Sequence, residues 1–144
     1  MSKYLSSKNI FSTLILWGVV LFMCTMLFLG ILKEQLPLAP ILILSLVIAL
    51  LLWTLLDTRY VVNEAFLLYR SGPFRGKIAI QNIKKITYFS GFNIPVTMKP
   101  ALDYKGFIVQ YNSFDDVFIS PKNADLFIAE ILKINPEIEV LPKK

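Results

Sequence analysis

Residues 11–32 read FSTLILWGVVLFMCTMLFLGIL and residues 38–56 read LAPILILSLVIALLLWTLL, and these two stretches decide the fold. Neither contains Asp, Glu, Lys or Arg. Each is long enough to cross the hydrocarbon core of a bilayer as a helix, which takes about 20 apolar residues. The segment between them, 33–37, is too short for anything but a turn. The sequence therefore predicts a transmembrane helical hairpin that serves as an anchor.

The composition also indicates a membrane protein. Of 144 residues, 56% are hydrophobic, the mean hydropathy is +0.62 and the net charge is +5, a combination that a soluble domain of this size would not carry. We therefore divide the chain into residues 1–56, which hold the N-terminal tail and the hairpin (11–32, 38–56), and residues 57–144, which form one small domain. The first apolar run lacks a small-residue cleavage site, so we expect a retained helix rather than a signal peptide.

The distribution of basic residues predicts an orientation. Lys3 and Lys8 precede the hairpin and Arg59 follows it, whereas Lys33 is the basic residue of the 33–37 turn. Because basic residues concentrate on the cytoplasmic side of membrane helices, we expect both termini in the cytoplasm and the turn outside.

After residue 56 the pattern changes to short β-favouring runs separated by turn-forming residues. Strands are predicted at 59–62, 65–70, 77–80, 83–90, 106–111 and 116–119, with a short helical turn as an alternative at 81–84. Glycine and two prolines make 91–103 an irregular loop, part of which can pair at a sheet edge.

A single amphipathic helix is predicted at the C-terminal end. We expect Ser120 to cap it and Pro121 to occupy its first position, while Asn135-Pro136 ends it. Its apolar stripe recurs at helical spacing and consists of Ala124, Phe127, Ile128, Ile131 and Leu132. The predicted fold class is a membrane-anchored α+β protein, in which the hairpin precedes a small antiparallel β-barrel or sandwich capped by a C-terminal α-helix.

Several motifs between residues 57 and 141 carry a resemblance to a known family: Tyr60-Val61-Val62, Leu67 to Arg70, Gly72-Pro73-Phe74-Arg75, Ile80 with Ile83 and Ile86, Ile119-Ser120-Pro121-Lys122, Phe127-Ile128, Leu132 and Asn135-Pro136. With them the segment resembles the YyaB-like bacterial pleckstrin-homology-like (PH-like) domains, some of which also follow a helical hairpin. The resemblance implies a β-barrel-like sandwich of about seven strands with a C-terminal helix, and a non-enzymatic binding role at the bacterial cell (inner) membrane. The 91–103 loop departs from the family pattern.

Residue usage argues against several kinds of chemistry. The chain has no histidine, and its lone Cys24 lies in the first apolar run, which removes Ser-His and Cys-His nucleophile pairs and histidine metal sites. Asp115-Asp116 lack a third ligand at useful spacing and suit a turn. Residues 57–144 hold 12 basic and 9 acidic side chains without a nucleic-acid-binding motif. We therefore expect no enzyme activity, no cofactor, no metal and no nucleic-acid partner.

Charge is the most uneven feature of the domain. Between Ala65 and Leu102 there is no acidic residue, but there are six basic ones: Arg70, Arg75, Lys77, Lys84, Lys85 and Lys99. A basic residue near an anionic leaflet gains about 1 kcal/mol. We hypothesise that Arg70, Arg75, Lys77, Lys84 and Lys85 contact anionic lipid headgroups or an acidic partner membrane protein. The alternative is that they are solvated charges that keep strand edges from pairing.

Three functions are compatible with these features. The first is a non-catalytic, multi-pass module that meets membrane lipids through its two helices and binds a partner protein or the anionic membrane surface. The second is a protective protein that confers immunity to a bacteriocin or toxin. The third is an accessory subunit of a membrane transporter or enzyme.

Overall fold

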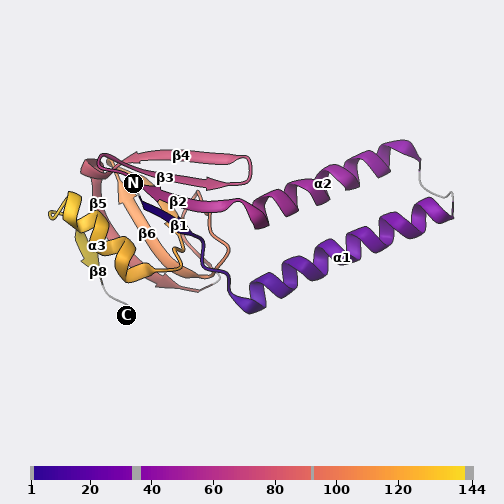
Figure 1. The fold of residues 1–144 in the computed structure, drawn as a ribbon, viewed down its shortest axis with the longest axis horizontal. Coiled ribbons are helices and arrows are strands. Elements are labelled where there is room, and N and C mark those ends of the chain that lie inside the picture. Colours follow the sequence, from indigo (N-terminus) through magenta and orange to yellow (C-terminus); the bar gives the residue numbers. More distant parts are fainter. Residues whose placement is uncertain (1, 34–36, 92, 142–144) are drawn as a thin grey trace.

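The computed structural model describes residues 2–33, 37–91 and 93–141. Two long helices, α1 (Ile10–Leu32) and α2 (Leu38–Leu56), lie side by side and project from a β domain (Figure 1). Both are long and apolar enough to cross a membrane, and only 6% of the most apolar window of each helix is buried by the rest of the chain. The two predicted helices are thus confirmed.

The β domain consists of two four-stranded sheets. The first sheet has the order β1-β2-β3-β4 and is antiparallel throughout, with strands Ser2–Leu5, Thr58–Val62, Phe66–Ser71 and Phe74–Ala79. The second sheet has the order β7-β6-β5-β8, with strands Asp115–Ile119, Lys105–Tyr111, Ile83–Ser90 and Glu139–Leu141. Its β5–β8 pair is parallel and the other pairs are antiparallel. A single 3₁₀ turn, Ile80–Asn82, connects the two sheets.

The main core lies between the sheets and beneath α3 (Ala124–Ile134). Alternate residues of the strands point into it, among them Tyr60, Val62, Leu67 and Ile78, each no more than 2% exposed. Helix α3 adds Phe127 and Ile131 from its apolar stripe, so it covers the core as the sequence predicted. The fold class is confirmed as a helix-capped sandwich, and within the described residues the sheets do not close into a barrel.

A second, smaller apolar cluster lies on the other face of the second sheet. The segment that follows β5 returns across this face, where Ile94 packs against Ile108 and Phe118, with Phe89, Val96 and Ala101 around them. Most of the predicted 91–103 loop is irregular as expected, and Met98 forms an isolated bridge with Val117 at the edge of β7. The chain therefore covers the outer face of the second sheet around Ile108 and Phe118, whereas Gln110 on the same face is exposed.

The N-terminal tail contributes a strand that the sequence did not predict. Ser2–Leu5 form β1, which pairs with β2 so that Leu5 lies opposite Arg59. Tyr4 packs edge-on against Phe127 with ring centroids 5.3 Å apart, and its hydroxyl donates a hydrogen bond to Glu130. Burial, together with this hydrogen bond and the charge of Glu130, raises the pKa of Tyr4 to about 12. The tail is therefore tied to α3, and the division of the chain at residue 56 stays a prediction.

The predicted start of the C-terminal helix is wrong. Helix α3 begins at Ala124 with Asn123 as its N-cap residue, rather than at Ser120-Pro121. Ser120 is buried and bonds instead to the tail, since its hydroxyl lies 2.9 Å from that of Ser6 and its carbonyl accepts the Ser7 N–H. A serine beside a proline favours a helix start locally, but here pairing with a distant segment takes its hydrogen bonds.

The buried hydroxyl of Tyr60 joins three segments that are far apart in the sequence. It donates a hydrogen bond to the Pro100 carbonyl (2.6 Å), accepts one from the Ser120 N–H (3.1 Å) and lies 3.4 Å from Ser6 Oγ. Burial raises the pKa of Tyr60, so the phenol stays neutral and keeps its proton for Pro100. This network holds the tail and the 93–101 segment against β2.

Tyr60→Phe tests the network. The substitution leaves the Ser120 N–H and the Pro100 carbonyl buried without this partner, so we expect the free energy of unfolding of the domain to fall by about 1–3 kcal/mol. Denaturant unfolding of the full chain in mild detergent, followed by near-ultraviolet circular dichroism, would measure it. Tyr69→Phe is the matched control, because the described residues offer that hydroxyl no hydrogen bond. Equal losses in both variants would contradict the assignment.

Candidate functional site

The outer face of the first sheet gathers all the basic residues of its strands. Strands β1 to β4 contain five basic residues and no acidic one. Residues two apart in a strand point to the same face, so Arg59 lies with Val61, and Arg70 with Leu68, opposite the core-facing Tyr60 and Tyr69. The same alternation and the strand register place all five on one face, here called the basic face: Lys3, Arg59, Arg70, Arg75 and Lys77.

The basic face has two cross-strand rows with different chemistry. Arg59, Arg70 and Arg75 are direct neighbours on β2, β3 and β4 and form the arginine row. The next row is Lys3, Val61, Leu68 and Lys77. Each strand reaches the arginine row at its end nearest the helices, so the lysines lie two residues further away, about 7 Å at the usual rise of a strand.

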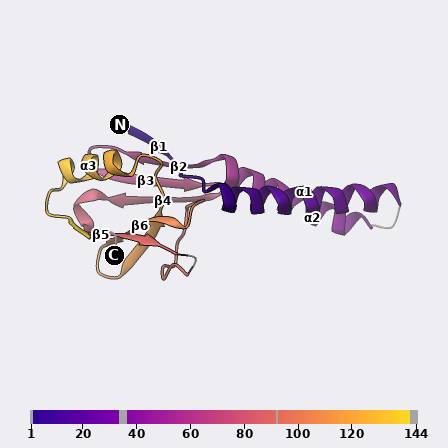
Figure 2. The ribbon, with the colours of Figure 1, turned by 90° about the horizontal axis from the view of Figure 1, so that it is seen from below.

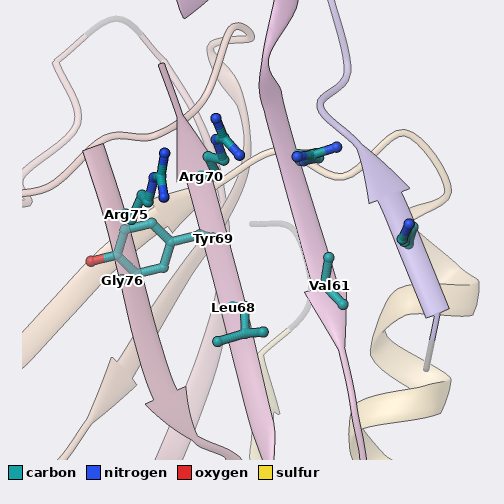
Figure 3. A pocket seen from close by; sticks show the side chains of 8 residues that line it. Val61, Leu68, Tyr69, Arg70, Arg75 and Gly76 are labelled. Carbon is teal, nitrogen blue, oxygen red and sulfur yellow. The ribbon is translucent and has the colours of Figure 1, made fainter. Parts of the chain in front are cut away.

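A shallow hollow of about 370 Å³ opens on this face. Figure 3 shows Arg70 and Arg75 next to each other on neighbouring strands, with Leu68 and Val61 below them. Tyr69 and Gly76 also line it, and burial raises the pKa of Tyr69, so the phenol adds no negative charge. The hollow therefore has an apolar floor and a cationic rim.

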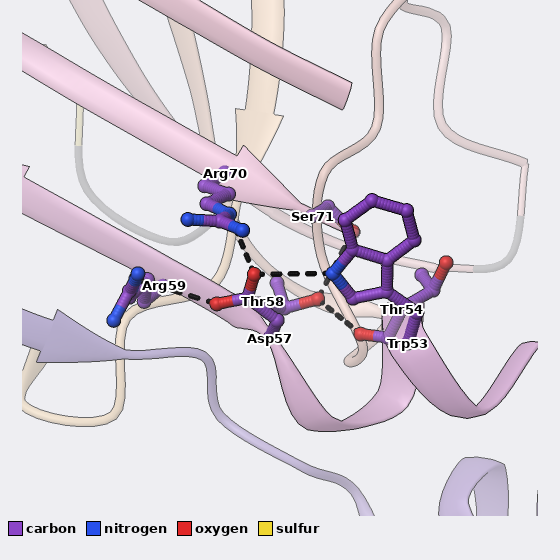
Figure 4. Close-up of polar contacts among 7 residues, drawn as sticks. All are labelled: Trp53, Thr54, Asp57, Thr58, Arg59, Arg70 and Ser71. Carbon is purple, nitrogen blue, oxygen red and sulfur yellow. Dashed lines mark hydrogen bonds and ion pairs between the residues drawn. The ribbon is translucent and has the colours of Figure 1, made fainter. Parts of the chain in front are cut away.

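Asp57 organises the arginine row from the end of α2. Its carboxylate lies 3.4 Å from Arg59 Nε and 2.5 Å from Arg70 Nε, and it accepts a hydrogen bond from the Trp53 indole (3.3 Å; Figure 4). Although Arg70 Nε is close to the carboxylate, it is buried without a hydrogen bond of good geometry, so this contact is an ion pair rather than a directed bond. One carboxylate thus faces two guanidinium groups.

Helix α2 passes into β2 through this single residue. The Thr58 hydroxyl donates to the Thr54 carbonyl (2.6 Å) and lies 3.0 Å from the Ser71 hydroxyl, while the Ser6 N–H donates to the Thr58 carbonyl. Strands β2 to β4 run roughly along the same direction as the two helices in both views (Figures 1 and 2). The arginine row is therefore the part of the basic face nearest the helices.

The structure brings together three of the five residues that the sequence singled out. Arg70, Arg75 and Lys77 lie on the basic face, and Lys77 Nζ also stacks 3.6 Å from the centroid of the Phe66 ring. Lys84 and Lys85 belong to β5 in the second sheet, where Lys85 lies 3.7 Å from Glu139. The register of β5 against β6 shifts between Ile83 and Lys85, which marks a β-bulge or irregularity there.

Two residues of the basic face, Lys3 and Arg59, are not among the contact residues predicted from the sequence. Lys3 lies in a strand that only pairing with β2 creates. The sequence places Arg59 in a strand beside the membrane but not among the predicted contact residues, although alternation with the core residues Tyr60 and Val62 puts it on the outer face. Strand parity could have found Arg59, whereas no local signal indicated Lys3.

The acidic pair considered as a metal or acid–base site, Asp115 and Asp116, accepts hydrogen bonds from neighbouring residues. Asp115 accepts a hydrogen bond from the Asn112 side chain (2.8 Å), and Asp116 from the Thr97 N–H (3.4 Å). The described residues contain no group of three His, Cys, Asp or Glu side chains placed to hold a metal ion. We therefore take the basic face as the candidate site.

The domain consists of two stacked sheets closed by a C-terminal helix, and one sheet has an open basic face. Two apolar helices come between β1 and β2 in the sequence. This arrangement is that of a PH-like binding module joined to a helical hairpin. The family model described as "Bacterial PH domain" matches residues 58–135, and the chain belongs to this family. The resemblance stated from the sequence is thus confirmed. Domains of this kind are generally non-catalytic binding modules.

One curated relative extends the similarity beyond the domain. The chain is 26% identical over 105 residues to the "Uncharacterized protein YyaB" of Bacillus subtilis (strain 168), which covers 70% of this chain and 68% of that protein. No solved structure matches the chain.

Asp57→Asn tests the electrostatics of the arginine row. Without the carboxylate, Arg59 and Arg70 repel each other across a strand pair, so we expect the domain to lose about 0.5–1 kcal/mol at low salt. High salt screens the repulsion and should remove most of this loss. Denaturant unfolding at low and high sodium chloride would measure it, with Glu137→Gln, an exposed acidic residue outside the helices and strands, as the control. A loss that is the same at both salt concentrations would refute the explanation.

Proposed function

We propose that this protein is a non-catalytic binding module held at the bacterial cell membrane by α1 and α2, with both termini in the cytoplasm. Its arginine row contacts the anionic headgroups of the cytoplasmic leaflet. The observation that carries the proposal is the basic face: five cationic side chains on one sheet surface, directly continuous with a helix apolar enough to span a membrane.

The direction of the strands decides which residues reach the lipid. Because β2 to β4 continue roughly along the helices, the ends of these strands face the membrane, and the first sheet does not lie flat on it. Arg59 is three residues after the last residue of α2, and the register puts Arg70 and Arg75 at its level. Long arginine side chains can extend toward the phosphate layer from there, as they do at the ends of membrane helices.

Arginine suits this position. Its planar guanidinium binds phosphate through two parallel hydrogen bonds and sheds water more readily than an ammonium group. Asp57, between α2 and β2, contacts Arg59 and Arg70 and orients them. Its single negative charge does not cancel the three positive charges of the arginine row. The lysines of the next row lie about two residues further from the helices. Lys84 and Lys85 on the second sheet add to the positive field without sharing the face.

The triple variant Arg59→Gln/Arg70→Gln/Arg75→Gln tests the contact with lipid. In the full chain, reconstituted in phosphatidylcholine nanodiscs, we expect the association of spin-labelled phosphatidylglycerol relative to phosphatidylcholine to fall at least tenfold, since each basic residue contributes about 1 kcal/mol. Electron paramagnetic resonance measures the motionally restricted fraction of each lipid.

The matched control is Lys84→Gln/Lys85→Gln/Lys133→Gln, which removes the same charge from β5 and α3. We expect it to retain most of the preference. If both triple variants lose it equally, net charge rather than the arginine row is responsible. If the parent protein shows no preference for phosphatidylglycerol, the basic face does not contact anionic lipid and the proposal is overturned.

The orientation is tested separately with single cysteines in a Cys24→Ser background. Lys33→Cys, at the end of α1, should react with a membrane-impermeant maleimide in intact cells, because it would face the outside. Ser113→Cys, in the exposed β6–β7 turn, should react only after the cells are broken. The reverse pattern would place the β domain outside the cell.

A further inference from the structure

The turn between β3 and β4 lies against the last helical turn of α2. Gly72 adopts a positive φ of 55°, and a Cβ at this position would come within 2.8 Å of Thr54 Oγ1 and 3.2 Å of the Thr54 Cα. The Ser71 and Thr58 hydroxyls meet beside it. The β3–β4 turn therefore sits at the level of the helix end, closer to the membrane than the arginine row.

A second segment reaches the same level from the other sheet. Residues 97–100 are held in place because the Met98 carbonyl accepts the Phe118 N–H (2.9 Å) and the Pro100 carbonyl accepts the Tyr60 hydroxyl (2.6 Å). Between this segment and the β3–β4 turn is a cavity of about 340 Å³, bordered by Thr54, Phe74, Met98, Lys99 and Pro100. Its walls are mostly apolar, with one lysine among them.

Two large apolar side chains beside the cavity are open to the surroundings. Phe74 is 57% exposed and Met98 is 36% exposed, although both come from segments that hydrogen bonds or close packing hold in place. Trp53, 45% exposed, lies one residue before Thr54 on α2. Aromatic side chains at the end of a membrane helix are typical of the interfacial layer, where apolar surface and polar headgroups meet.

We infer that Phe74 and Met98 lie in the interfacial layer of the cytoplasmic leaflet and that the cavity between them takes a phospholipid. The glycerol and the first acyl carbons pack on Phe74, Met98 and Pro100, and the ammonium of Lys99 binds the phosphate. The inference rests on the proposal that α1 and α2 span the membrane, because only then does the bilayer reach Thr54. It does not depend on the arginine row, which lies on the opposite side of β3 and β4 from Phe74.

Depth-dependent quenching tests the position of the two side chains. In the full chain with Trp17→Phe and Trp53→Phe, Phe74→Trp or Met98→Trp supplies a single reporter in proteoliposomes. We expect each to be quenched by lipids brominated high in the acyl chain more strongly than by lipids brominated near its end. Phe114→Trp is the control, since Phe114 is 99% exposed in the β6–β7 turn at the far end of the domain, and it should respond to aqueous acrylamide alone.

The outcomes separate this inference from the proposed function. If a chain that retains Trp17 alone is quenched by brominated lipid but the Phe74→Trp and Met98→Trp reporters behave like Phe114→Trp, the helices span the membrane and the interfacial contact is wrong. If the Trp17 reporter is not quenched, the membrane-spanning proposal fails, and the lipid site fails with it.

Photolabelling tests the occupant of the cavity. Phosphatidylglycerol with a diazirine on an upper acyl carbon should label residues 71–74 and 97–100 in the proteoliposomes, in addition to α1 and α2. Lys99→Gln should reduce this labelling severalfold, whereas Lys84→Gln on β5 should leave it unchanged. Labelling confined to α1 and α2, or insensitive to Lys99→Gln, would overturn the lipid site even if the quenching result holds.

Discussion

One buried hydroxyl, that of Tyr60, links the segments that join the domain to both helices. A buried phenol must find hydrogen-bond partners or destabilise the fold, and here its partners come from Pro100 and Ser120, with Ser6 beside them. Ser6 leads into α1, and Tyr60 itself is three residues after Asp57, where α2 ends. Both helices are therefore tied to the same point of the core, and the domain is joined to them without a flexible linker. The motif Ile119-Ser120-Pro121-Lys122, which carries much of the family resemblance, serves this attachment, since Ser120 and Lys122 also bond to the tail.

This attachment restricts which surfaces can meet a membrane. A binding domain on a long linker could turn any face toward the lipid. A sheet whose strands continue the direction of a spanning helix can turn only the ends of its strands toward it. Residues on the same basic face therefore differ in their distance from the helices according to their row. Arginine occupies the row nearest the helices and lysine the row further away, which is the order expected if the first row binds phosphate and the second remains hydrated.

Sequence reasoning was successful where the signal is local. The hairpin, the strands from β2 to β7 and the stripe of α3 all follow from hydropathy, β-favouring residues and helical spacing. It failed where pairing between distant segments decides the structure: β1 and β8 are short strands that exist because β2 and β5 offer free edges, and Ser120 bonds to the tail instead of capping a helix. The candidate site shows the same limit, because a run of basic residues along the chain does not show that Lys84 and Lys85 belong to a different sheet from Arg75.

The outer faces of the two sheets differ in how far the chain covers them, and this difference favours the first sheet as the binding surface. On the second sheet the 93–101 segment covers Ile108 and Phe118, so the chain itself buries the apolar part of that face. On the first sheet Val61 and Leu68 are only half-buried and form the floor of a hollow whose rim is cationic. The aliphatic stems of arginine and lysine can shield such a floor while their charged ends stay in water. A surface that needs only solubility would mix acidic and basic residues, whereas every charged residue of these four strands is basic. This favours a binding surface for an anionic partner.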